Sequence, residues 1–179
     1  CEVYGKGLFG YKTKKNLILN AGNSGTTARL LCSALIDTNN KIKIIGDKSL
    51  NKRDMNRIVG PLRMFGANIK TRNGKLPITI EKPKSLKPIV YKENRGSAQC
   101  KSAVMIAALK TKGKTKLKCA PSRNHTELMF KKVLQIPISS KRNRGMDIIE
   151  LKGLNQFKPF NYKIPGDISS ASFFIVLAL

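Results

Sequence analysis

The sequence predicts an α+β fold in which a unit of the order βαβαββ is repeated. Three observations predict it: a glycine-led stretch that occurs three times, a strand, turn and helix that follow the first two copies, and two short strands that close each unit. Related stretches begin with glycine at residues 22–35, 96–109 and 166–179, so that their starts are 74 and 70 residues apart. The first two are each followed by a strand, an arginine-containing turn and a second amphipathic helix, and each unit then closes with two short strands. Because one unit alone cannot cover its helices, we expect the copies to pack into a pseudo-symmetric domain with internal helices and outer sheets.

Each repeat opens with an extended segment that leads into a helix. The stretch 17–31, LILNAGNSGTTARLL, is an apolar run that stops at Gly-Asn-Ser-Gly-Thr-Thr and restarts with helical spacing. The first turns carry residue types that cap helices, because short polar side chains accept hydrogen bonds from the free N–H groups there. The candidate caps are Asn23 or Ser24, Ser97, and Asp167 or Ser169.

The second part of each unit is a strand, an arginine in a turn and an amphipathic helix. Strands are predicted at 41–47 and 114–120, and Arg53 and Arg123 lie in the turns that follow. Helices are predicted at 54–67 and 124–136, because apolar residues recur there at helical spacing. These apolar residues are Met55, Ile58, Val59, Leu62 and Phe65 in the first helix, and Leu128, Met129, Val133 and Leu134 in the second.

Two short strands close each unit. The predicted strands are 68–72 and 76–82 in the first unit, and 137–141 and 147–153 in the second. Asn73-Gly74 separates the first pair, and Asn143-Arg144-Gly145 separates the second. Such residues favour the positive φ angles of tight hairpin turns, so each pair is predicted to be a hairpin.

The composition allows a real hydrophobic core but leaves the partner open. The chain has 179 residues, of which 41% are hydrophobic, enough for one domain or one and a half. Its formal net charge of +25 suggests polyanionic partners such as nucleic acid, an acidic membrane surface or phosphorylated metabolites. However, the lysines are spread over all elements without arginine-rich blocks or interleaved aromatic residues, and AT-rich codon usage offers an equally good explanation of the charge.

The cysteines and the single histidine do not form a recognisable metal motif. Cys1, Cys32, Cys100 and Cys119 include no C-x-x-C pair, and His125 has no metal-like spacing around it. We therefore expect reduced, buried thiols in a cytosolic protein and no metal site.

The ends of the sequence lead to two further expectations. The longest apolar run, at 173–179, is too short to span a bilayer, and no signal peptide opens the chain. Because the first residue is Cys and the last lies within an apolar helical pattern, the sequence is expected to be a fragment.

The turns that precede the helices are candidate anion sites. A helix N-terminus carries free N–H groups and a partial positive charge, and Gly22 and Gly25 allow a ligand to approach the backbone. Arg53 and Arg123 add planar guanidinium groups that bind phosphate or carboxylate through two hydrogen bonds. The alternative is that these residues only cap helices, but three copies facing one surface favour converging anion sites.

At these residues the chain resembles the 5-enolpyruvylshikimate-3-phosphate synthase family of enolpyruvyl transferases. The motifs follow the family's order over nearly the whole chain: GNSGTTARLL, KRDMNRIVGPLRMFGA, SAQCKSA, SRNHTE and PGDISSASFF. The resemblance implies a two-domain protein in which each pseudo-threefold domain contains three copies of the unit. By this comparison residues 1–160 are most of one domain, with two repeats and the tail of another, and residues 161–179 begin the return into the second domain.

The resemblance also implies a reaction. The family transfers the enolpyruvyl group of phosphoenolpyruvate to the 5-hydroxyl of shikimate 3-phosphate and releases phosphate, with no metal or organic cofactor. The acid–base residues of the family, an Asp, a Lys and a Glu, belong to the other domain. No catalytic residue is therefore expected in this chain, which is predicted to be inactive alone but to retain weak binding of shikimate 3-phosphate.

Carried over by motif, two sets of residues are implied to bind substrates. Phosphoenolpyruvate is assigned to Asn23, Gly25, Thr26, Arg53 and Gln99. Shikimate 3-phosphate is assigned to Ser97, Ala98, Gln99, Ser122 and Arg123, so Gln99 touches both ligands.

Four other residues near these motifs need separate interpretations. Arg29 is either a structural ion-pair partner or a ligand contact, and Lys101 is expected to be a solvated lysine or, alternatively, a ligand-side cation. His125 is a candidate acid or base, but its position in a helix-capping turn favours a structural or supporting role. Asp54 replaces the family's usual proline, where it suits a helix start but is expected to weaken the grip of Arg53 on an anion.

Two other functions stay open at this point. The enolpyruvyl transferase that acts on UDP-N-acetylglucosamine shares the fold, but the motif SAQCKSA fits the shikimate enzyme better. An RNA-binding or RNA 3′-end-processing protein is the alternative from another class, because RNA 3′-terminal phosphate cyclases have a related unit. The favoured interpretation is a cytoplasmic monomer whose partners are the two small substrates, with neither nucleic acid nor membrane involved.

Overall fold

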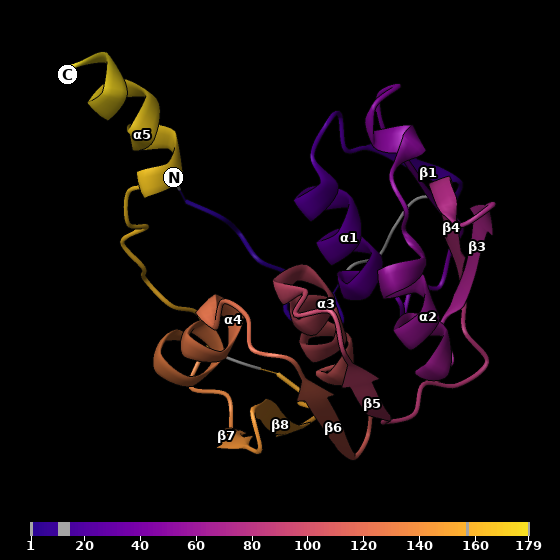
Figure 1. Ribbon diagram of the computed structural model, residues 1–179. Coiled ribbons are helices and arrows are strands. Elements are labelled where there is room, and N and C mark those ends of the chain that lie inside the picture. The colour runs from indigo at the N-terminus through magenta and orange to yellow at the C-terminus, as the bar shows by residue number, and fades with distance from the viewer. Residues whose placement is uncertain (1, 11–14, 157, 179) are drawn as a thin grey trace.

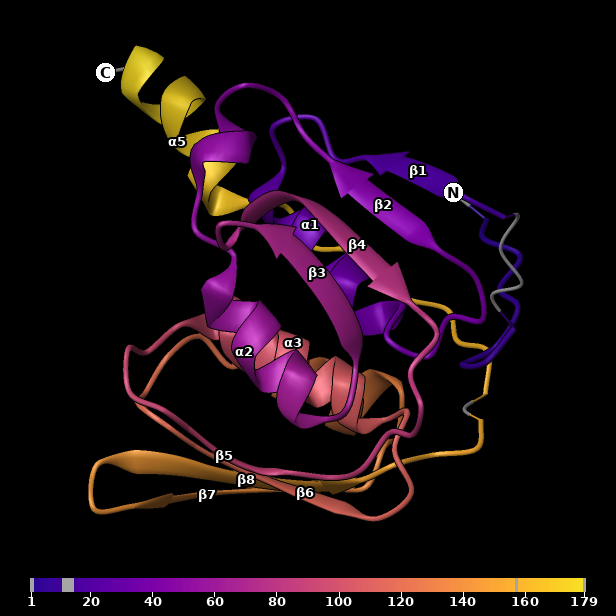
Figure 2. The ribbon, with the colours of Figure 1, turned by 90° about the vertical axis from the view of Figure 1, so that its right-hand side faces the viewer.

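The computed structural model describes residues 2–10, 15–156 and 158–178, which form two four-stranded sheets with helices between them (Figures 1 and 2). The first unit contains β1 (Leu17–Asn20), α1 (Gly25–Ala34), β2 (Ile42–Ile45), a 3₁₀ turn (Leu50–Lys52), α2 (Asn56–Met64), β3 (Asn68–Arg72) and β4 (Lys75–Glu81). The second contains β5 (Val90–Glu93), α3 (Ala98–Ala108), β6 (Lys114–Cys119), α4 (His125–Leu128), a π-helix (Met129–Val133), β7 (Ile138–Asn143) and β8 (Met146–Lys152). Helix α5 (Ile168–Leu177) follows.

The two sheets have the same topology, which confirms the repeat. Their strand orders are β1-β2-β4-β3 and β5-β6-β8-β7, so each fourth strand along the chain lies inside its sheet. The first two strands of each sheet are parallel, and the other neighbours are antiparallel. Both predicted hairpins are present, and their turn residues Asn73, Gly74, Arg144 and Gly145 have φ angles of 51°, 71°, 46° and 73°. These left-handed angles match the twist of the flanking strands.

Helices α1, α2 and α3 lie between the sheets, so the arrangement of internal helices and outer sheets is also confirmed (Figure 2). Helix α3 packs against both α1 and α2 and therefore joins the two units. Its residues Ala103, Val104, Met105 and Ala107 are fully buried, and one hydrophobic core extends through both units. The small side chains of α3 allow this close packing on several sides.

The apolar face predicted for α2 is confirmed, because all five of its residues are fully buried. The face predicted for the second unit's helix is wrong in part. Leu128 and Met129 are each 40% exposed, whereas Phe130 and Ile136 are buried. The physical reason is a π-turn, in which the N–H of Leu134 donates to the carbonyl of Met129 at 3.0 Å. The five-residue spacing widens the helix and breaks the 3.6-residue periodicity on which the prediction depended.

Helix α5 confirms the helix expected in the third repeat. It stands apart from the packed helices (Figure 1), and Phe173 and Phe174 are 79% and 75% exposed. The helix begins after Asp167, and the carbonyl of Asp167 accepts a hydrogen bond from the N–H of Ala171 at 3.0 Å. The side chain of Ser169, the other candidate cap, lies outside the described part of the structure. The assignment of residues 161–179 to the passage into a second domain stays a prediction.

The described cysteines are buried free thiols, as predicted. Burial raises the pKa of Cys32 to about 12, and mainly for the same reason the pKa values of Cys100 and Cys119 rise to about 11. Cys1 lies outside the described residues. Within the part of the chain that the structure describes, every helix is too short or too polar to cross a membrane.

Candidate anion-binding site

The N-termini of α1 and α3 are built alike, one in each repeat. The Ser24 hydroxyl accepts from the N–H of Thr27 at 3.1 Å, and the Ser97 hydroxyl accepts from the N–H of Cys100 at 3.2 Å. Ser24, rather than Asn23, is therefore the cap of α1. The capping explanation accounts for the two serines and leaves Asn23 available for other contacts.

Gln99 connects the two repeats at these helix starts. Its side-chain nitrogen donates to the Thr26 hydroxyl at 2.7 Å, and its side-chain oxygen accepts from Arg29 Nη1 at 2.7 Å. Gln99 lies on the first turn of α3, whereas Thr26 and Arg29 lie on α1. Packing of α1 against α3 thus brings together side chains that are about 70 residues apart in the sequence.

A chain of hydrogen bonds from Asp47 positions Arg53. The Asp47 carboxylate accepts from the N–H of Leu50 at 2.7 Å and from the Asn23 amide at 2.6 Å. The Asn23 oxygen in turn accepts from Arg53 Nη2 at 3.1 Å. These hydrogen bonds, with the Leu50 N–H contributing most, hold the pKa of Asp47 below its usual value. Asp47 therefore fixes which end of the Asn23 amide faces the arginine.

Both guanidinium groups lie over the first turn of α1, beside Gly25. A methyl group on Gly25 would lie 2.9 Å from Arg29 Nη1 and 3.3 Å from Arg53 Nη1. Burial, and then the positive charges of Arg53 and Arg57, lower the pKa of Arg29. Clustered cations that repel one another at a helix N-terminus bind anions well, because a bound anion relieves the repulsion.

Arg29 lies within this cluster, and its contact with a ligand stays a prediction. Its Nη2 donates weakly to the carbonyl of Asp54 at 3.4 Å, and its Nη1 faces Gln99, so the side chain belongs to the cluster. The Asp54 carboxylate accepts from the N–H of Asn56 at 2.9 Å at the start of α2. Arg53 donates to Asn23. The expectation that Asp54 weakens the grip of Arg53 on an anion stays a prediction.

The residues assigned to shikimate 3-phosphate lie around the start of α3. Lys101, one turn into α3, donates to the carbonyl of Ser122 at 3.4 Å. A methyl group on Gly96 would lie 3.2 Å from the carbonyl oxygen of Pro121, so the two segments are in close contact. The Ser122 hydroxyl oxygen is buried and has no hydrogen-bond partner among the described residues. Arg123 is exposed, Ser97 caps α3, and Ala98 is the first residue of α3.

Lys101 corrects one expectation, and His125 stays compatible with another. Lys101 is fully buried and pairs with Glu127 at 2.6 Å, so a solvated lysine is wrong. The sequence around Lys101 gave no sign of its partner Glu127, which lies on α4. His125 is the first residue of α4 and is exposed, which leaves its supporting role a prediction.

Two acidic residues that the sequence did not single out organise the site. Glu93 accepts from the N–H groups of Arg95 and Ser97 at 2.9 and 3.1 Å, and it therefore shapes the turn before α3. Asp47 likewise orients Asn23 by accepting a hydrogen bond from its side-chain amide. The available signal was their rarity, since the chain has only 10 acidic residues against 35 basic ones. Glu93 is the last residue of β5, and Asp47 lies two residues after β2.

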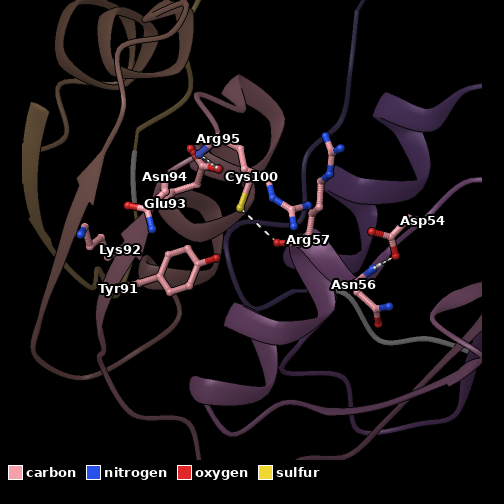
Figure 3. Close-up of a pocket in the computed structure, with 9 residues that line it drawn as sticks. All are labelled: Asp54, Asn56, Arg57, Tyr91, Lys92, Glu93, Asn94, Arg95 and Cys100. Atoms are coloured by element: carbon pink, nitrogen blue, oxygen red, sulfur yellow. Dashed lines mark hydrogen bonds between the residues drawn. The ribbon is translucent and has the colours of Figure 1, made fainter.

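A polar cavity of about 450 Å³ lies next to this cluster (Figure 3). It is lined by residues from the start of α2 and from β5 to α3, including Arg57, Tyr91 and Arg95. Cys100 also lines it, and its thiol donates to the carbonyl of Arg57 at 3.1 Å. None of the residues assigned to the two substrates lines this cavity, although Asp54 does. The assigned residues lie beside it, on the surface where α1 and α3 begin.

The chemistry of the cluster is that of anion binding. It combines guanidinium groups, an amide, hydroxyls and free N–H groups at two helix starts, which suit the binding of phosphate and carboxylate groups. Guanidinium, amide and hydroxyl groups offer hydrogen bonds to charged ligands, so this cluster is suited to orienting ligands rather than to exchanging protons with them.

Comparison with known proteins agrees with this geometry. Residues 2–179 match the family model of EPSP synthase (3-phosphoshikimate 1-carboxyvinyltransferase). The chain is 42% identical over 177 residues to the 3-phosphoshikimate 1-carboxyvinyltransferase of Ruthia magnifica subsp. Calyptogena magnifica, covering 98% of this chain and 39% of the relative. It is 44% identical over 165 residues to the same enzyme of Caldicellulosiruptor saccharolyticus, covering 90% of this chain and 38% of the relative.

A solved structure of an EPSP synthase has the same fold as this chain. An EPSP synthase from Acinetobacter baumannii superimposes with a TM-score of 0.81 at 38% identity, covering 97% of this chain and 38% of that chain. The chain thus spans about two fifths of the length of the relatives that it matches. None of these relatives supports the UDP-N-acetylglucosamine or RNA alternatives. With a family match over nearly its whole length and the fold of a solved member, the chain belongs to the EPSP synthase family.

Proposed function

We propose that the protein carrying this chain transfers the enolpyruvyl group of phosphoenolpyruvate to the 5-hydroxyl of shikimate 3-phosphate, in the biosynthesis of chorismate and the aromatic amino acids. The hydroxyl oxygen adds to C2 of phosphoenolpyruvate and gives up its proton, while C3 gains one. The C2–O bond to phosphate then breaks and C3 loses a proton, so the products are the enolpyruvyl ether and inorganic phosphate. The matching family and relatives support this assignment.

The observation that carries the proposal is the convergence of Gly25, Arg29, Arg53 and Gln99 from two repeats. In this proposal the α1 side of the cluster, with Asn23 and Thr26, binds phosphoenolpyruvate. Both substrates carry several negative charges, so fixed guanidinium groups hold them in reacting orientation and reduce the entropic cost of the encounter.

Shikimate 3-phosphate is assigned to the other side of Gln99. Ser97 and Ala98 form the start of α3, and Lys101 on the same helix donates to the carbonyl of Ser122, the neighbour of the exposed Arg123. The buried Ser122 hydroxyl without a partner supports this placement, because a ligand oxygen would satisfy it. Gln99 lies between the two sets and is proposed to contact both ligands.

We further propose that the proton transfers are made by residues outside this chain and that the complete protein is a cytoplasmic monomer that uses no cofactor and engages neither nucleic acid nor membranes. The buried free thiols of Cys32, Cys100 and Cys119 support a reducing compartment. The chain alone is then expected to bind shikimate 3-phosphate weakly and to have no transferase activity.

Calorimetric titration of the chain tests the binding half of the proposal. We expect saturable binding of shikimate 3-phosphate and much weaker binding of shikimate, which lacks the phosphate. The complete protein should form the enolpyruvyl product with shikimate 3-phosphate but not with UDP-N-acetylglucosamine. Absence of any reaction with shikimate 3-phosphate, or tight RNA binding whose logarithm falls steeply with the logarithm of salt concentration, contradicts the proposal.

A further inference from the structure

Lys101 is fully buried, although lysine is rarely excluded from water unless it is paired. Its Nζ lies 2.6 Å from Glu127 Oε1, and the side chains of this pair are 1% and 8% exposed. The same Nζ donates to the carbonyl of Ser122 at 3.4 Å. One ammonium group therefore holds a helix residue and a loop residue at once.

These contacts join the two segments assigned to shikimate 3-phosphate. The backbone N–H of Lys101 donates to the carbonyl of Ser97 at 3.0 Å, which places Lys101 one turn beyond the cap of α3. Its side chain then reaches Ser122 in the other segment. A second link lies alongside, because the hydroxyls of Ser102 and Thr126 are 2.6 Å apart.

The hydrogen-bonding groups of this buried cluster are only partly satisfied. The Ser122 hydroxyl and Glu127 Oε2 are both buried without a hydrogen-bond partner among the described residues. The unpaired Ser122 hydroxyl would be stabilised by a hydrogen bond to a ligand oxygen. The negative charge of Glu127, in contrast, would repel a phosphate group at the same place. Lys101 neutralises that charge while it holds the Ser122 backbone.

We propose that Lys101 is a positioning residue for shikimate 3-phosphate: it fixes Ser122 and cancels the charge of Glu127, so that the Ser122 hydroxyl and Arg123 can receive the phosphate. This inference rests on the proposed function. A buried ion pair is not required for stability, because an apolar pair of similar volume is often equally stable. Lys101 and Glu127 therefore supply orientation that an apolar pair cannot supply.

The test compares variants of the complete protein that carries this chain, with KM for each substrate and thermal unfolding as measurements. Lys101→Met leaves Glu127 uncompensated and should raise KM for shikimate 3-phosphate most. The double variant Lys101→Met/Glu127→Leu removes both charges and should unfold near the wild-type temperature, yet its KM for shikimate 3-phosphate should rise about tenfold. Glu127→Gln keeps the Lys101–Ser122 contact and should leave this KM within about twofold. KM for phosphoenolpyruvate should stay within about twofold in all three.

The matched control is a second lysine–carboxylate pair next to α3, in which the lysine side chain is 2% exposed and the carboxylate side chain 23% exposed. Lys110 Nζ lies 2.6 Å from Asp37 Oδ1 beyond the C-terminal end of the helix, away from the site. Lys110→Met/Asp37→Leu should leave both KM values unchanged.

The inference is overturned if the Lys101 double variant binds shikimate 3-phosphate as tightly as wild type, if KM for both substrates rises equally, or if Glu127→Gln matches Lys101→Met. A wild-type protein that shows no reaction with shikimate 3-phosphate overturns the proposed function itself, so the two failures are distinguishable.

Discussion

Arg29 on α1 donates to Gln99 on α3 at 2.7 Å, across 70 residues of sequence and from one repeat to the other. The amide nitrogen of the same Gln99 donates to Thr26, so the glutamine is held at both ends. Because its two partners lie on α1, the orientation of Gln99 depends on how α1 packs against α3. The candidate site is therefore a property of the interface between the repeats.

Replacing Arg29 tests this interface. Arg29→Lys keeps the charge but loses the planar fork that reaches Gln99, so we expect KM for phosphoenolpyruvate to rise about tenfold, the equivalent of one charge-assisted hydrogen bond. Steady-state kinetics of the complete protein provide the measurement. Arg142→Lys, in the exposed hairpin pair with Asp147, is the control and should behave as wild type. Equal KM values for the two variants contradict the assignment of Arg29.

Gly25→Ala is expected to affect binding rather than folding. The added methyl group would lie 2.9 Å from Arg29 Nη1 and 3.3 Å from Arg53 Nη1. Both guanidinium groups would therefore have to shift away from Gly25, which the flexible side chains allow without unfolding. We expect weaker binding of phosphoenolpyruvate with an unchanged unfolding midpoint.

Gly60→Ala is the matched control, because Gly60 lies inside α2 with no atom within 4 Å of an added methyl group. It should raise the free energy of unfolding by about 0.5–1 kcal/mol, the helix preference of alanine over glycine, without changing KM. If Gly25→Ala leaves the affinity for phosphoenolpyruvate intact, the two arginines do not define its binding position.

Asp47 is expected to make stability depend on pH. Its pKa is lower in the folded protein than its usual value of 3.8, so the stabilisation that it provides is complete above that value. The stabilisation is lost as the pH falls through the lower folded pKa. Urea unfolding of wild type and Asp47→Asn should therefore differ at pH 6, and the difference should shrink below pH 3.8. A difference that stays constant down to pH 2 would show that the carboxylate charge plays no part.

The π-turn in the second unit can be tested through its neighbouring side chains. Phe130 is buried and Met129 is 40% exposed, the reverse of what regular helical spacing predicts for Met129. We expect Phe130→Ala to lower the free energy of unfolding by about 3–5 kcal/mol and Met129→Ala by about 0.5 kcal/mol. Chemical denaturation measures both. Equal losses would mean that the helix is regular and that both side chains share the core.

The sequence by itself determined the repeated unit, the order of its elements, both hairpins and the apolar face of α2. It also identified the glycine, serine and arginine residues at the helix starts. These features depend on local chemistry: side-chain periodicity, the positive φ angles of turns such as Asn73-Gly74, and caps such as Ser24 and Ser97 that bond within three residues.

Only the tertiary structure decided how these parts meet. The contact of Gln99 with Arg29, the relay from Asp47 to Arg53 and the burial of Lys101 against Glu127 each join residues from different elements. A lysine looks the same in the sequence whether water or a carboxylate faces it, because its burial depends on what packs opposite. The packing of α3 against α1 and the side-chain contacts of α3 with α4 provide those opposing groups. The packing of α3 against α1 also places the anion-binding residues of the two repeats on one surface.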